Sequence, residues 1–140
     1  MADYYTSFSC LLDVGSPDNA RKALDLYRAF ADELDETEYC TIGFDVTVEP
    51  GGNGSTLWIH DGDSADPEHV IQFARRCAEA FGLKGRWGFE YANTCSKPRL
   101  DAYGGGAHVL DLGSGRTIGW ISTYEWLAAQ LDEDDAGTST

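Results

Sequence analysis

One pattern occurs twice in this chain and constrains the fold more than any other feature of the sequence. Ser16-Pro17 and Asp66-Pro67 each open a stretch of helical periodicity. An apolar-Gly-Phe-acid tetrad follows each stretch, at residues 42–45 and again at 87–90. The two prolines lie 50 residues apart and the two tetrads 45 residues apart. We therefore expect two copies of one helix-then-strand unit.

The pattern predicts helices over 17–34 and 67–81. Ser16 and Asp66 are suitable N-caps, and a proline fits the first helical position because its missing N–H has no partner there. Apolar residues then recur every three or four positions in both segments, as expected of a helix with one buried face. Gly82 is expected to end the second helix in the left-handed conformation.

Apolar residues alternate with polar ones in the segments that flank these helices. This period of two predicts strands over 4–14, 39–48, 56–60 and 86–94. The resulting order, β-α-β-β-α-β, is that of the ferredoxin-like split βαβ arrangement, an antiparallel sheet with both helices on one face. The fold class is therefore predicted to be α+β, with a duplicated core over 4–48 and 55–94. A C-terminal β-hairpin over 106–112 and 116–122, and then a short helix over 123–131, are expected to extend it.

The length of 140 residues fits one domain, placed at 1–131. The acidic residues 132–140 are expected to form a disordered tail. The sequence has no apolar run of about 18 residues, so no membrane segment is predicted. The first residues carry no basic side chain before a short apolar run, so no signal peptide is predicted and a cytoplasmic location is expected. The four cysteines are scattered without metal-ligand spacing and are expected to be reduced.

Negative charge is the second strong signal. The chain carries 10 basic and 24 acidic residues, a net charge of −14. The net charge is −12 over residues 1–74, +4 over residues 75–99 and −6 over residues 100–140. Such a field repels nucleic acid and anionic membranes and favours a basic protein partner. The alternative is that the charge only keeps the protein soluble.

One acidic segment is the candidate binding site. It is an acidic strip that comprises Asp32, Glu33, Asp35, Glu36, Glu38, Asp61 and Asp63. The first five lie at the end of the first predicted helix, where negative charge opposes the helix dipole. Local stability therefore does not account for them, and two explanations remain: a solvated surface or a contact for a cationic partner.

Catalytic and cofactor chemistry has no positive signal. Asp45 and Glu90 occupy equivalent steps of the two repeated strands and, with Trp58, are candidates for a polar sheet face. Their strands are expected at opposite edges of the sheet, too far apart for an acid/base couple. The residues after His60 imitate the start of a calcium-binding loop but lack its later ligands. The glycine run 104–106 is followed by a predicted strand, whereas a phosphate-binding glycine run is followed by a helix. We predict no catalytic residue, no cofactor and no metal.

Three functional hypotheses follow. The first is a non-enzymatic acidic binding protein that docks on a basic protein. A specific form is a phage- or plasmid-type inhibitor that mimics nucleic acid, similar in charge and size to anti-restriction and anti-CRISPR proteins as a class. The second is a small accessory domain that binds a small ligand or self-associates through its sheet face. The third and weakest is an enzyme that uses Asp45, Glu90 or His60.

Overall fold

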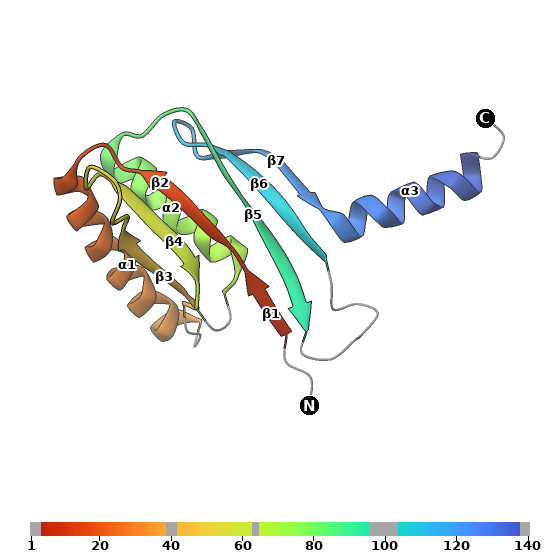
Figure 1. Ribbon diagram of the computed structural model, residues 1–140, viewed down its shortest axis with the longest axis horizontal. Coiled ribbons are helices and arrows are strands. Elements are labelled where there is room, and N and C mark those ends of the chain that lie inside the picture. Colours follow the sequence, from red (N-terminus) through yellow and green to blue (C-terminus); the bar gives the residue numbers. More distant parts are fainter. Residues whose placement is uncertain (1–3, 39–41, 63–64, 96–103, 138–140) are drawn as a thin grey trace.

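The structure is a computed structural model that describes residues 4–38, 42–62, 65–95 and 104–137. Over these ranges it is a mixed α+β structure with two antiparallel sheets and three helices (Figure 1). The elements in chain order are β1 (Tyr4–Ser7), β2 (Ser9–Asp13), α1 (Pro17–Thr37), β3 (Phe44–Val48), β4 (Thr56–Asp61), α2 (Pro67–Phe81), β5 (Arg86–Cys95), β6 (Gly104–Asp111), β7 (Arg116–Ser122) and α3 (Thr123–Gly137). The predicted α+β class is confirmed.

The predicted first strand is divided between the two sheets. β1 pairs with β5 in a sheet of order β1-β5-β6-β7, and β2 pairs with β4 in a sheet of order β2-β4-β3. Phe8 alone separates β1 from β2, and its N–H donates to Asp61 Oδ1 at 2.9 Å. Its carbonyl accepts from the Asp61 N–H at 3.1 Å. Asp61 therefore holds the chain at the point where it leaves one sheet and joins the other.

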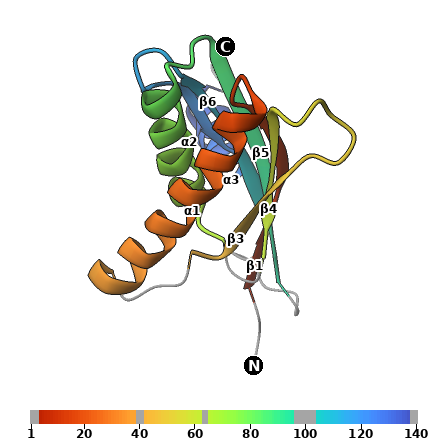
Figure 2. The same cartoon turned by 90° about the vertical axis from the view of Figure 1, so that its left-hand side faces the viewer.

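The two main helices form for the predicted reasons. Ser16 Oγ accepts from the Asn19 N–H at 3.1 Å, and the Asp66 carboxylate accepts from the Glu68 N–H at 3.0 Å. Gly82 ends α2 with φ of 64°, so the predicted bounds of α2 are confirmed. α1 continues three residues beyond the predicted end, to Thr37. Both helices lie on the same side of the strands (Figure 2).

The core lies between these helices and the strands. Phe44 is 1% exposed, and its ring contacts those of Tyr27 on α1 and Phe73 on α2, with centroids 5.5 and 6.0 Å apart. Phe89, its counterpart in the second tetrad, is also buried, but its aromatic neighbours are Trp87 and Tyr91 on β5 and Phe8 at the junction of β1 and β2, and none lies on a helix. The two tetrads thus both bury a phenylalanine, in different surroundings.

The glycines of the two tetrads also serve different purposes. Gly43 has φ of 76°, a conformation that costs other residues about 1–2 kcal/mol. Gly88 is extended, and a Cβ there would lie 2.6 Å from the His108 carbonyl oxygen of β6. The first glycine is therefore needed for backbone conformation and the second for close strand approach.

The C-terminal third extends the sheet and then leaves it. β6 pairs with β5, and β7 pairs with β6. β5 is therefore an inner strand of its sheet, and the prediction that it lies at an edge was wrong. α3 continues to Gly137, six residues beyond its predicted end, so 132–137 are helical rather than disordered. Residues 138–140 lie outside the described residues. α3 projects away from the rest of the molecule (Figure 1).

Candidate functional site

The topology gathers acidic side chains at one end of the molecule. α1 ends, β3 begins, β4 ends and α2 begins at this end, since Phe44 and Asp61 are opposite in the β3–β4 register. We call it the acidic end, and its exposed carboxylates are Asp32, Asp35, Glu36, Glu38, Asp45, Asp66 and Glu68. The last two lie at the start of α2, where the helix dipole favours negative charge; the first four oppose the dipole of α1.

Residues of the predicted acidic strip have different environments. Glu33 pairs with Arg76 at 2.6 Å, and the Arg76 guanidinium lies over the Phe30 ring at 4.4 Å. Asp61 is half-buried and binds the Phe8 N–H. Asp63 lies outside the described residues. The ion pairs of the described ranges leave out the other four, Asp32, Asp35, Glu36 and Glu38.

The predicted sheet-face residues do not form one site. Asp45 is exposed on β3, an edge strand, and Glu90 is exposed on β5. β4 and β2 lie between β3 and the β5 side, a separation of roughly 14 Å at normal strand spacing. Trp58 stacks on His60 with centroids 4.3 Å apart, and its Nε1 donates to Ser9 Oγ at 2.8 Å. Asp45 and Glu90 are too distant to share a proton.

A large apolar surface lies on β7 and α3. We call it the β7–α3 surface, and its exposed side chains are Ile118, Trp120, Ile121, Tyr124, Trp126, Leu127 and Leu131. Each is about half exposed or more, and the described residues include just two other exposed large apolar side chains, Leu11 at 48% and Trp58 at 38%. Exposed apolar side chains gathered on two neighbouring elements are typical of an interaction site.

The first part of this surface continues the helix-facing side of the sheet. Trp120 is opposite His108 in the β6–β7 register, and His108 is opposite Phe89 of the core. The Trp120 ring meets the His108 ring edge-on at 5.2 Å, and Trp120 Nε1 donates to Tyr91 Oη at 3.1 Å. Trp120 remains 51% exposed. The face that α1 and α2 cover elsewhere is therefore open at β7.

α3 is apolar on more than one side. Tyr124, Leu127 and Leu131 share one stripe by helical spacing, and Trp126 lies on the other side of the helix. The Thr123 hydroxyl accepts from the Gly105 N–H at 2.9 Å and fixes the start of the helix on β6. A helix normally buries its apolar stripe against another element. The Tyr124 stripe of α3 is exposed, so it is available for a contact with another surface.

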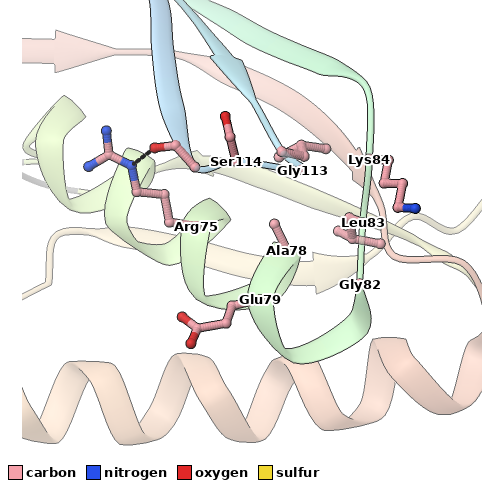
Figure 3. Close-up of a pocket in the computed structure, with 10 residues that line it drawn as sticks. Arg75, Ala78, Glu79, Gly82, Leu83, Lys84, Gly113 and Ser114 are labelled. Carbon is pink, nitrogen blue, oxygen red and sulfur yellow. Dashed lines mark hydrogen bonds between the residues drawn. The ribbon is translucent and has the colours of Figure 1, made fainter.

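A basic groove lies beside the β6–β7 turn. It is a cavity of about 520 Å³ between the end of α2 and residues 112–115 (Figure 3). Arg75 and Lys84 line it, and Arg75 Nε donates to the Gly115 carbonyl at 2.8 Å. Leu83 and Leu112 supply apolar contacts in the same groove. Glu79 also lines the groove, so two basic side chains and one acidic side chain face it in a chain of net charge −14.

Other reactive groups give no indication of chemistry. Burial raises the pKa of the Cys10 and Cys77 thiols to about 12, so neither is a nucleophile near neutral pH. No group of three His, Cys, Asp or Glu side chains in the described ranges could hold a metal ion. None of the helices in those ranges is long and apolar enough to cross a membrane. Comparisons with protein families, curated proteins and solved structures found no match to this chain.

Sequence reasoning did not identify the β7–α3 surface. It predicted an apolar β-hairpin over 106–112 and 116–122 and a short helix over 123–131. Two signals were present: Trp126 lies opposite the Tyr124 stripe, and the predicted core is complete before residue 106.

His108 is expected to make stability depend on pH. Its side chain is 2% exposed, Nε2 lies 3.0 Å from Thr117 Oγ1, and burial, with Arg75 nearby, lowers its pKa below 6.5. The unfolded chain therefore binds this proton more readily. The stabilisation is fully present above about pH 6.5 and is lost as the pH falls below it, by at most about 1.4 kcal/mol per pH unit.

Urea unfolding at about pH 7.5 and about pH 5.5 measures this effect, and His108→Gln is the comparison variant. The variant should lose less stability between the two pH values than the wild type. An equal loss in both proteins would show that His108 does not carry the effect.

Proposed function

We propose that this chain is a non-enzymatic binding protein whose acidic end docks on a basic protein. The observation that carries the proposal is the convergence of seven exposed carboxylates where α1, β3, β4 and α2 meet. Glu33 pairs with Arg76. The helix dipole does not stabilise the negative charges of Asp32, Asp35, Glu36 and Glu38 at the end of α1. A basic surface would give these charges a partner.

A specific form of the proposal is an inhibitor that mimics nucleic acid. Duplex DNA presents one charge per about 1.7 Å of its axis, and closely spaced carboxylates can imitate such a row. The chain itself would not bind nucleic acid, because its net charge of −14 repels phosphate. DNA should instead compete with the chain for the basic partner.

A ferredoxin-like core is part of the proposal. β3, β4 and β2 are neighbours, and β1, which continues from β2, lies beside β5. This order, read across the two sheets, supports a duplicated split βαβ core with α1 and α2 on one face. In such a core the two helix-to-strand repeats, 4–48 and 55–94, would be related by a pseudo-twofold axis.

Neutralising the acidic end is expected to remove partner binding without harming the fold. The variant combines Asp32→Asn, Asp35→Asn, Glu36→Gln and Glu38→Gln. Its free energy of unfolding should be unchanged or slightly higher, because acids at a helix C-terminus cost about 0.3–1 kcal/mol each. Partners captured by the immobilised wild type are identified by mass spectrometry at about 0.1 M and about 1 M salt, where the Debye length is about 10 and 3 Å.

The matched control removes the same charge elsewhere: Glu49→Gln, Glu79→Gln, Glu90→Gln and Asp132→Asn. We expect the control to retain the partner, the acidic-end variant to lose it, and duplex DNA to displace it from the wild type. If both variants capture the same proteins as the wild type at each salt concentration, the acids serve solubility alone.

The β7–α3 surface favours a second candidate, an accessory domain that self-associates. Seven large apolar side chains are exposed there, and the helix that bears four of them packs mainly on the neighbouring strands β6 and β7. Self-association and the binding of a basic protein use different surfaces, so the two candidates are compatible.

A further inference from the structure

We propose that the β7–α3 surface is the interface of a symmetric dimer in which β7 pairs antiparallel with β7 of a second copy. The inference deepens the self-association candidate and makes no use of the acidic end. It names the occupant of the surface, the strand that forms the contact and the direction in which the second chain runs.

β7 is an unprotected edge strand. It is the last strand of its sheet, and residues 116–121 are exposed. Native proteins usually protect such edges with lysine, proline or a covering helix. Residues 117–122 contain no charge and no proline, and α3 leaves the edge instead of covering it. The free backbone groups of β7 are therefore available to another strand, and an identical strand matches their length.

The charge of the surface permits a second copy to approach. The net charge of −14 makes copies of this chain repel one another over most of their surface. Residues 116–131 carry one positive and one negative side chain, Arg116 and Glu125. Two copies can therefore meet through this segment with little repulsion between like charges.

The exposed apolar area can supply a large part of a dimer interface. Seven side chains that are about half exposed supply roughly 100 Å² each, or at most about 700 Å² if both faces of β7 and α3 are used, since aromatic residues can bury about 150–250 Å². A standard interface buries about 800 Å² per partner. The polar backbone of β7 and the basic groove would add to the apolar area.

A twofold arrangement also satisfies charge. If the pair is centred on Gly119, Arg116 lies opposite Ser122 of the second copy, directly before the second copy's α3. That helix then begins beside the β6–β7 turn and the basic groove with Arg75 and Lys84. It carries Glu125 and Asp132. Within one chain, Arg116 is opposite Asp111 in the β6–β7 register and lies at the far end of a strand of roughly 20 Å from Glu125. The twofold arrangement would bring Arg116 of one copy to the end of β7 that precedes Glu125 of the other.

The first test is the mass in solution of Ile118→Lys against Leu11→Lys. Ile118 and Leu11 are both 48% exposed, but Leu11 lies on β2, away from the proposed interface. Light scattering and sedimentation over a range of concentrations should give twice the mass of one chain for the wild type and for Leu11→Lys. For Ile118→Lys we expect the dissociation constant to rise by about tenfold or more. A monomeric wild type, or an equal response of the two variants, overturns the proposal.

The second test is a charge exchange across the axis. Arg116→Glu and Glu125→Arg should each weaken the dimer, and the double variant should restore it. Arg28→Glu makes the same change in net charge on α1 and should have a smaller effect than Arg116→Glu. A double variant no stronger than the weaker single variant contradicts the antiparallel twofold pair.

The acidic-end variant separates this inference from the proposed function. It should dimerise as the wild type does, even where it no longer captures a basic partner. Conversely, a monomeric wild type that still captures the basic partner would overturn the dimer and leave the proposed function intact. A heterologous partner on β7, in a protein that is monomeric at all concentrations, would also overturn the dimer.

Discussion

Alanine in place of Phe44 is expected to lower the free energy of unfolding by about 3–5 kcal/mol, the usual cost of removing a buried phenylalanine. The ring is 1% exposed and lies within 6.5 Å, between centroids, of the rings of Tyr27, Phe73 and Phe8. These three neighbours come from α1, α2 and the junction of β1 and β2. Removing the ring therefore leaves a cavity where four segments meet and cannot easily collapse.

Guanidinium unfolding of Phe44→Ala, Phe89→Ala and Leu11→Ala measures the effect. Phe89 is 6% exposed and its loss should cost a similar amount, whereas Leu11 is half exposed and its loss should cost less than about 1 kcal/mol. A Phe44→Ala protein as stable as the Leu11→Ala control would exclude the packing described here.

Valine in place of Gly105 is expected to destabilise the protein by about 3 kcal/mol, at the upper end of the usual cost of overpacking. Gly105 is extended and buried on β6, and a Cβ there would collide with the Tyr91 carbonyl oxygen and lie 3.2 Å from the Ala92 Cα. Both obstacles belong to the backbone of β5, which cannot rotate away. The β5–β6 pairing must therefore open to admit the side chain.

Gly119→Ala is the matched control, because Gly119 also lies in a strand of this sheet and a Cβ there meets nothing within 4 Å. Its thermal stability, measured at low protein concentration, should remain within about 0.5 kcal/mol of the wild type. If Gly105→Val and Gly119→Ala unfold at the same temperature, β5 and β6 are not packed as closely as described.

The local fold was predictable where sequence periodicity and capping agree. Ser16 and Asp66 mark the starts of α1 and α2, and Gly82 marks the end of α2. Each of these residues acts on its own helix terminus, so its effect does not depend on the rest of the chain. The division of the first strand at Phe8 was not predictable in this way, because it depends on the distant carboxylate of Asp61.

The same distinction between local sequence signals and contacts of distant residues applies to the candidate sites. The acidic end could be foreseen because charge is read directly from residues 32–38, yet the pairing of Glu33 with Arg76 depends on how α1 and α2 pack. The β7–α3 surface was missed because alternation of apolar residues does not tell which strand will be left at an edge. The glycine run at 104–106 was predicted to precede a strand, whereas the structure includes it in β6, where it approaches the neighbouring strands closely.

The division of the first strand has a consequence for the order in which the chain can fold during its synthesis. β1 is made first, but its partner is β5, with Tyr4 opposite Cys95. At about 5–20 residues per second, the ribosome takes roughly 5–20 s to make the intervening chain. β2 gains its partner β4 earlier, once residue 61 has been made. The N-terminus of the nascent protein therefore stays unpaired while the rest of its strand is already in place, and contacts of such long sequence separation slow folding.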